Sequence, residues 1–135
     1  MPSLHITKVA VGCGHVDALR ERQRSRLRDG YVPILTRFLP KRADALIGGS
    51  LYWIIKHRFT VRQTIFGFEP SAADQRTIIR LAPELVPVQA LPKRAHQGWR
   101  YLDQIDAPPD LDGQTDILEA LPPHVAQELL ELALI

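Results

Sequence analysis

The sequence has a single cysteine, Cys13, so no disulfide can form within the chain. Nothing in its cysteine usage therefore points to an oxidising compartment. Long apolar runs are also missing, because the longest one in the middle of the chain, residues 51–55, is far too short to span a bilayer. Residues 1–11 lack the basic region and apolar stretch of a signal peptide. These absences predict a cytoplasmic protein without membrane segments.

Spacings that mark common catalytic and metal sites are missing as well. The sequence has no Cys-x-x-Cys or His-x-x-x-His pair, so we expect no metal. It has no Gly-x-Gly-x-x-Gly, P-loop or Gly-x-Ser-x-Gly pattern, and we expect no cofactor. Cys13 and His15 are close enough for a thiol to meet a base, but a lone cysteine is more often a small buried hydrophobic residue. A binding protein is therefore favoured over an enzyme.

Basic residues are missing from the C-terminal part of the chain. Residues 103–135 hold 8 acids and no Lys or Arg, whereas residues 1–102 hold all 17 Lys and Arg and 7 acids, a net charge of +10. This asymmetry predicts either an anionic partner for the basic part or an acidic tail that folds back on it. The alternative is an ordinary charged surface whose two halves neutralise each other.

The 135 residues correspond to about one ordinary domain. We expect this domain to cover residues 1–111 and an acidic helical tail, docked on it, to cover residues 112–135. A chain of short strands with few helices predicts an α+β fold, with a small, strongly curved mixed sheet or a partly open β-barrel, peripheral helices and a C-terminal helix. The leucines of the last helix need a cover, which leaves both a monomer and a homodimer through this helix open. The expected strands are residues 4–11, 31–39, 51–55, 59–68, 77–81, 86–91 and 99–102, and the expected helices are residues 17–28, 41–47, 115–121 and 123–135.

Alternation along residues 59–68 predicts which side chains face the core. Phe59, Val61, Gln63 and Ile65 share one face, with Arg62 on the other. A buried amide at position 63 needs partners, so Gln63 either ties down the core or lines a polar pocket inside the barrel, and the structural role is favoured.

Glycines mark three further positions. Gly30 is expected to cap the helix over residues 17–28, and Gly67 marks a bulge or bend in its strand. The segment 48–50, Gly-Gly-Ser, either presents backbone N–H groups to a phosphate or forms a plain tight turn, and the turn is favoured.

Basic, polar and aromatic residues interleave in segments 40–44, 48–56 and 93–101. Because Lys and Arg neutralise phosphates and aromatic rings stack on bases, this pattern predicts a noncatalytic nucleic-acid or nucleotide-binding module, with RNA or a phosphate-bearing small molecule as its partner. Trp53 lies between Leu51 and Ile55 on one face of an expected buried strand, so we expect it in the core. The alternatives are a small enzyme with a phosphorylated or nucleobase-like ligand in a cleft between Tyr52 and residues 97–101, or a structural dimer. The candidate ligand-binding residues are Lys41, Arg42, Tyr52, Lys56, Arg62, Gln63, Gln97, Trp99, Arg100 and Tyr101.

The same segments resemble an uncharacterised bacterial family of short proteins. Its pattern is Pro-Lys-Arg-Ala-Asp, Gly-Ser-Leu-Tyr-Trp, Ile-Lys, Arg-Gln, Gln-Gly-Trp-Arg-Tyr-Leu and Asp-Ala-Pro-Pro-Asp-Leu, found here at residues 40–44, 49–53, 55–56, 62–63, 97–102 and 106–111. The chain departs from the pattern at His57, where glycine is expected, and the resemblance implies no activity. A looser likeness in style, to the RNA-binding barrels of the pseudouridine-synthase and archaeosine-transglycosylase type, concerns the fold alone.

Overall fold

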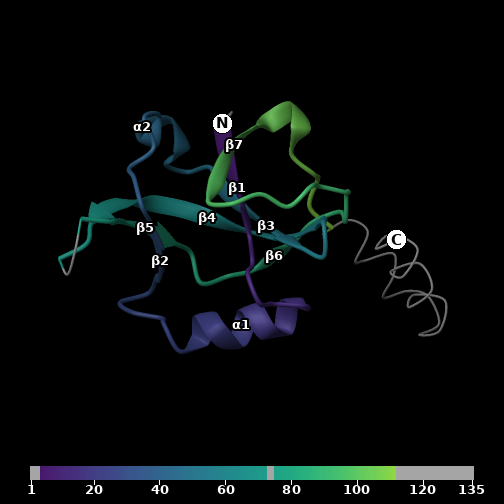
Figure 1. Cartoon of the computed structure of the whole chain (residues 1–135), viewed down its shortest axis with the longest axis horizontal. Helices are drawn as coiled ribbons and strands as arrows, with labels where there is room; N and C mark the ends of the chain where they lie inside the picture. The colour runs from purple at the N-terminus through teal and green to yellow at the C-terminus, as the bar shows by residue number, and fades with distance from the viewer. Residues whose placement is uncertain (1–3, 73–74, 112–135) are drawn as a thin grey trace.

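A computed structural model of the chain describes residues 4–72 and 75–111, which form a mixed β-sheet with short helices at its ends (Figure 1). The helices are α1 (Val16–Arg24), α2 (Ala43–Leu46) and a 3-10 turn, η1 (Gln104–Asp106). The strands are β1 (Leu4–Val9), β2 (Val32–Thr36), β3 (Ser50–Ile55), β4 (Arg58–Pro70), β5 (Thr77–Leu81), β6 (Val86–Pro87) and β7 (Trp99–Asp103). This confirms the α+β class and the mixed sheet, whereas the expected tail and its helices lie outside the described residues.

The strand order is β2-β5-β4-β3-β1-β7, with β6 pairing beside this path to β4. Since β2 and β7 end the order, the sheet does not close into a barrel. β1 pairs in parallel with β3, so that Ile6 lies opposite Leu51, and antiparallel with β7, so that Ile6 also lies opposite Tyr101. The parallel pairing requires a crossover connection, which contains α1, β2 and α2.

Two bulges bend β4, the longest strand. The register against β3 shifts so that Trp53 faces Val61 while Ile54 faces Phe59. Against β5 it shifts again between Ile65 and Gly67, where the sequence predicted a bulge or bend. A bulge bends its strand and increases the local twist, so these two shifts curve the sheet.

The first bulge also corrects the expected facing of Phe59. Phe59 packs with Tyr52 and Ile54 in a small cluster on one face of the sheet, whereas Val61 belongs to the main core on the other face. The extra residue in the bulge, which no alternation pattern reveals, moves Phe59 to the opposite side.

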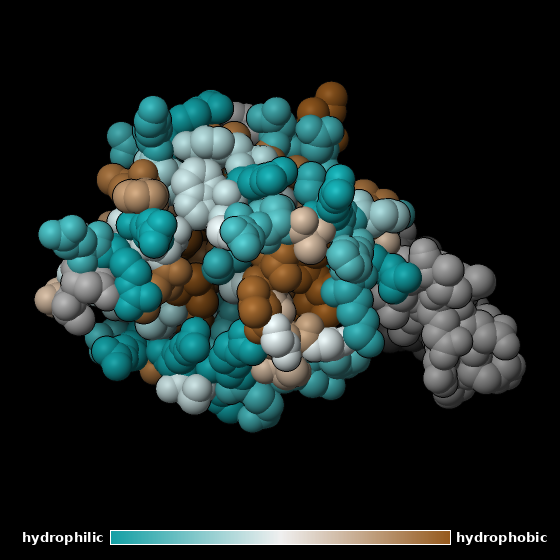
Figure 2. Space-filling view, viewed as in Figure 1, coloured by the Kyte–Doolittle hydropathy of each residue, from teal (hydrophilic) through white to brown (hydrophobic). Residues whose placement is uncertain are grey.

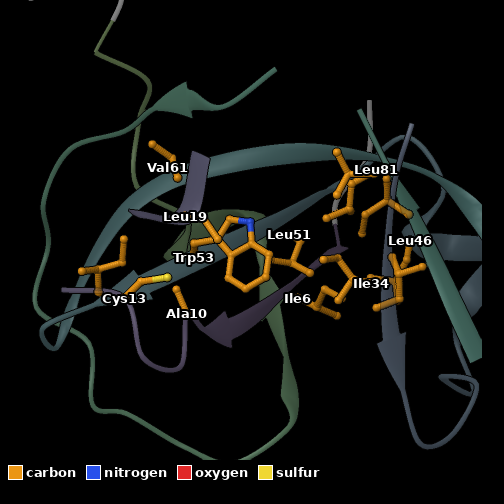
Figure 3. Close-up of a cluster of buried hydrophobic side chains, with 14 of the residues drawn as sticks. Ile6, Ala10, Cys13, Leu19, Ile34, Leu46, Leu51, Trp53, Val61 and Leu81 are labelled. Atoms are coloured by element: carbon orange, nitrogen blue, oxygen red, sulfur yellow. The ribbon is translucent and has the colours of Figure 1, made fainter. Parts of the chain in front are cut away.

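The main core lies on one face of the sheet and includes a residue from each of α1 and α2. Figure 3 shows Trp53 in the middle of this cluster, with Leu51 on one side and Cys13 on the other. Trp53 is only 3% exposed, which confirms its expected place in the core. Leu19 and Leu46, one from each helix, are fully buried against the cluster and fix both helices to the sheet.

The expected helix over residues 17–28 ends at Arg24 instead. Ser25 is its C-cap, and the Ser25 hydroxyl donates to the Arg22 carbonyl oxygen. Gly30 is therefore not a helix cap. It follows Asp29 in a tight turn in which both residues have positive φ and the backbone groups of Arg28 and Tyr31 bond to each other.

Most other elements lie within a few residues of their predicted bounds. β6 is also shorter than expected and covers Val86–Pro87 instead of residues 86–91, because the following backbone turns to other partners: the Gln89 N–H donates to the Pro109 carbonyl oxygen.

Candidate functional site

Gln63 stands at the centre of a buried polar network beneath α1. Its amide exchanges two hydrogen bonds of 2.7 Å with the amide of Gln23, accepts a third from Nε1 of Trp53 at 2.7 Å, and donates to the carbonyl oxygen of Ala82 at 2.9 Å. All its polar atoms thus have partners within the protein, although the side chain is 0% exposed. Of its two predicted roles, this arrangement is the structural one, because it ties α1 to the sheet and leaves no polar atom for a ligand.

Beside this network, α1 and the sheet enclose a cleft of about 530 Å³. Its apolar lining includes Trp53 from β3, Ile34 from the end strand β2 and Leu19 from α1. Figure 2 looks onto the side of the molecule between α1 and α2 and shows apolar surface in hollows bordered by hydrophilic residues. We name this space the α1 cleft; its cationic lining residues are Lys8, Arg22, Arg26 and Arg28.

The charge around the α1 cleft is of one sign. None of the residues that line it is acidic, and within residues 4–72 and 75–111 none of its four cations forms an ion pair. The acids of α1 instead pair on another side of the helix, where Asp17 binds Arg20 and Glu21 binds Arg24. Burial lowers the pKa of Lys8 from its ordinary value. An anion in the cleft would compensate these charges.

The opposite face of the sheet carries a second polar cluster, to which the segment after β7 contributes Gln104 and Asp110. Arg62 forms two hydrogen bonds of 2.7 Å with the carboxylate of Asp110 and a third, of 3.1 Å, with the Ser50 hydroxyl. The Arg62 hydrogen bonds lower the pKa of Asp110. His5 accepts the backbone N–H of Ser50 at Nδ1, so its Nε2 carries the proton and donates to Gln104 at 2.6 Å. Each of these groups is used inside the fold.

Tyr52 lies buried beside this second cluster. Its ring meets those of His5 and Phe59 edge-on, and burial raises the pKa of its hydroxyl. Because Tyr52 and Gln63 project from opposite faces of the sheet, they do not share a pocket.

A third group of candidates lies along the edge strand β7. The backbone N–H of Arg42 donates to the Tyr101 hydroxyl at 3.1 Å, and its guanidinium lies 6.0 Å from the centre of the Tyr101 ring. The rings of Trp99 and Tyr101 meet edge-on at 4.9 Å. Trp99 is half-buried against the main core, and Tyr101 is 40% exposed. The remaining candidates, Lys41, Lys56, Gln97 and Arg100, are exposed.

The Gly-Gly-Ser segment before β3 forms a tight turn. Gly48 donates its N–H to the Ile65 carbonyl oxygen, Gly49 to that of Leu46, and Ser50 to the His5 ring. With all three N–H groups engaged in the fold, this segment has none to offer a phosphate.

Cys13 and His15 do not form a catalytic pair in the structure. Cys13 is buried in the main core, whereas the His15 ring accepts the Asp17 backbone N–H and so caps α1. In the part of the chain that the structure describes, no three His, Cys, Asp or Glu side chains gather as a metal site would require. None of its helices is long and apolar enough to cross a membrane.

The four cations of the α1 cleft are absent from the residues that the sequence picked out. Arginine at every second position from Arg20 to Arg28 was the available signal. On a regular helix Arg20, Arg24 and Arg28 share one face, with Arg22 and Arg26 about a quarter-turn or more away, so the pattern did not group Arg22, Arg26 and Arg28. Because α1 ends at Arg24, Arg26 and Arg28 follow the chain away from the helix and line the same cleft as Arg22.

Comparison with known proteins gives one match. A family model described as "Protein of unknown function (DUF1489)" matches residues 6–135, nearly the whole chain. This confirms the expected membership of an uncharacterised family. No curated protein and no solved structure matches the chain.

Proposed function

The chain belongs to the DUF1489 family of proteins of unknown function, and from its own charge and shape we propose that it is a noncatalytic module that binds single-stranded RNA in the α1 cleft. The observation that carries this proposal is the lining of the cleft, which combines four cations without an ion pair in the described part of the chain with an apolar floor. Phosphates need cations and unpaired bases need apolar or aromatic surface, so the cleft offers both.

The net charge of the described residues supports the same ligand class. The described residues hold all 17 Lys and Arg and nine acids, a net charge of +8. Such a field raises the rate at which a polyanion meets the surface, and the cleft then holds it in place.

A nucleotide or another small phosphorylated ligand is the second candidate. The cleft of about 530 Å³ has the size of a small-molecule pocket, for which 300–1,000 Å³ is usual. The enzyme alternative placed its cleft between Tyr52 and residues 97–101. Tyr52 packs in the small cluster on one face of the sheet and Trp99 against the main core on the other, so these two side chains do not line one cleft.

Fluorescence anisotropy with a labelled eight-nucleotide single-stranded RNA tests the proposal. We expect binding at low salt whose affinity falls steeply as salt is added, because each phosphate contact releases counterions. The double variant Arg22→Gln, Arg26→Gln should weaken binding and reduce the slope of log K against log salt by about 1.4, at about 0.7 per contact. Competition with uridine monophosphate and with inorganic phosphate separates the two candidates.

The matched control is Arg20→Gln, Arg24→Gln, which removes the same charge from the neighbouring positions of α1. These two arginines are paired with Asp17 and Glu21 and do not line the α1 cleft. An equal loss of affinity in both double variants would mean that only the diffuse charge matters, and the assignment of the cleft would be wrong. No binding at low salt would overturn RNA recognition altogether.

A further inference from the structure

The α1 cleft has one lining residue, Lys8, that neighbours the aromatic residues on β7. Lys8, which lines the cleft, lies directly opposite Trp99 in the antiparallel pair of β1 and β7. Side chains of directly opposed residues project to the same face with their Cβ atoms about 5 Å apart. Trp99 therefore lies next to Lys8, beyond the residues that line the cleft.

On the same face, Tyr101 and Arg42 lie between Trp99 and α2. Tyr101 is two residues further along β7, so it shares the face of Trp99 and its ring meets that of Trp99 at 4.9 Å. Arg42, just before α2, lies over the Tyr101 ring and donates its backbone N–H to the Tyr101 hydroxyl. The contact joins the segment after β2 to β7, the two ends of the strand order, across the open side of the sheet.

We propose that single-stranded RNA held in the α1 cleft continues over Trp99 and Tyr101 to Arg42, with bases stacked on the two rings. This inference rests on the proposed function and adds the path and length of the ligand. Cations stand at both ends of this path, Lys8 at one and Arg42 at the other. Aromatic rings lie between them, which is the arrangement by which proteins bind a single strand without reading its sequence.

The alternation of charge and rings favours a nucleic acid over an apolar partner. A hydrophobic peptide or a second copy of the chain would cover the rings, but it would bury Lys8 and Arg42 without an anion. Burying an unpaired charge costs free energy. A phosphate backbone supplies an anion beside each cation, and its bases supply flat faces for the rings.

Tryptophan fluorescence with RNA of increasing length tests the path in the full chain. The two tryptophans differ, because Trp53 is 3% exposed while Trp99 is half-buried. We expect oligouridine of eight nucleotides to quench the emission of the wild type, and this quenching to disappear in Trp99→Phe. Uridine monophosphate, which fits in the α1 cleft alone, should bind without reaching Trp99.

Affinities measured by anisotropy provide the second readout. Trp99→Leu and Tyr101→Leu should each weaken binding of the eight-nucleotide RNA by about tenfold, while the affinity for uridine monophosphate changes less than about twofold. Trp99→Phe should retain most of the affinity, since phenylalanine still stacks. Phe66→Leu is the matched control, because Phe66 is an aromatic residue that is 49% exposed on β4, away from this path.

The two proposals fail in different ways. If RNA binding depends on Arg22 and Arg26 but neither quenches Trp99 nor weakens in the β7 variants, the stacking path is wrong and the cleft proposal stands. If RNA does not bind at low salt, both are overturned. An equal effect of Phe66→Leu would also contradict the path, because it would show a general loss of structure.

Discussion

Gln63 of β4 and Gln23 of α1 hold each other by two amide hydrogen bonds of 2.7 Å, forty residues apart in the chain and almost completely out of contact with solvent. The same Gln63 oxygen accepts from Trp53, and its nitrogen donates to Ala82. One side chain thus connects a helix, two strands and the loop after β5. The position of α1, and with it the α1 cleft, depends on this amide pair.

Gln63→Leu should lower the free energy of unfolding by about 3 kcal/mol, because it leaves the buried Gln23 amide and Trp53 N–H without their partner. Gln23→Leu should cost less, since Gln63 keeps two of its partners. The double variant should be less destabilised than the sum of the two, because removing both amides leaves fewer unpaired groups. Urea unfolding of the four proteins measures this coupling, and additive losses would show that the pair does not act as a unit.

His57→Gly should stabilise the protein by about 0.5–1 kcal/mol. Lys56 and His57 form the two-residue turn between β3 and β4, and both have positive φ, at 52° and 61°. This geometry favours glycine at the second position, which the resemblance to the family also led us to expect. The turn at Asp29 and Gly30 already has the favoured sequence, so Gly30→Ala should destabilise. Thermal unfolding measures both, and a lower melting temperature for His57→Gly would contradict the turn geometry.

Gly49→Ala should prevent folding or cost more than about 3 kcal/mol. A Cβ at this position would meet the backbone oxygen of Leu4 at 2.4 Å and that of Leu46 at 3.0 Å, and neither belongs to a flexible side chain. Gly14→Ala is the matched control, because its Cβ would only touch Lys56 at 3.6 Å and its φ is not positive. Circular dichroism and chemical unfolding should show a normal Gly14 variant beside a disrupted Gly49 variant, and two equally stable variants would disprove the close packing of β1 against Gly49.

Asp110→Asn should destabilise the protein by about 1 kcal/mol at neutral pH, given that the ion pair with Arg62 is partly exposed. Arg62 lowers the pKa of Asp110 in the folded state below its value of about 3.9 in an unfolded chain. The stabilisation is therefore fully present above about pH 4 and is lost as the pH falls through the folded-state pKa. Melting temperatures of the two proteins should converge below pH 4. Asp103→Asn, which removes an exposed carboxylate, is the control, and a constant difference at all pH values would exclude the ion pair as the cause.

Removing residues 112–135 should strengthen RNA binding at low salt. This segment carries five acids and no Lys or Arg, so its deletion raises the net charge from +2 to +7. The gain should fade as salt is added, because screening weakens charge interactions beyond about 10 Å at 0.1 M salt. Anisotropy of the full and shortened chains at two salt concentrations measures it, and an unchanged affinity at low salt would show that the acids do not oppose the anion.

The sequence predicted the elements whose signals are local and missed what depends on distant contacts. Alternation correctly placed Val61 and Gln63 in the core, and the apolar run around Trp53 marked a buried strand. The bulge that turns Phe59 to the other face results from pairing with β3, which alternation does not report. Gly30 was misassigned because a helix cap and a tight turn both favour glycine.

The sequence predicted the residue types of the candidate site better than their positions in the fold. Basic and aromatic residues were correctly seen to interleave, but the structure distributes the ten candidates over two faces and one edge of the sheet. Arg62 has the composition of a phosphate ligand, yet its partner is Asp110, 48 residues away. The cleft itself forms only where α1 packs across the sheet, so no stretch of sequence could have revealed it.

The position of β1 in the sheet order has a consequence for synthesis of the chain. One of its neighbours, β7, begins about ninety residues after β1 ends. At the usual pace of translation, roughly 5–20 residues per second, the N-terminal strand is made roughly 5 to 20 seconds before that partner exists. During this interval the backbone groups of β1 that later bond to β7 remain available to other chains, which is the situation in which strand edges associate. The nascent polypeptide should therefore aggregate most readily when it is arrested before residue 99, and become resistant once residue 103 has emerged.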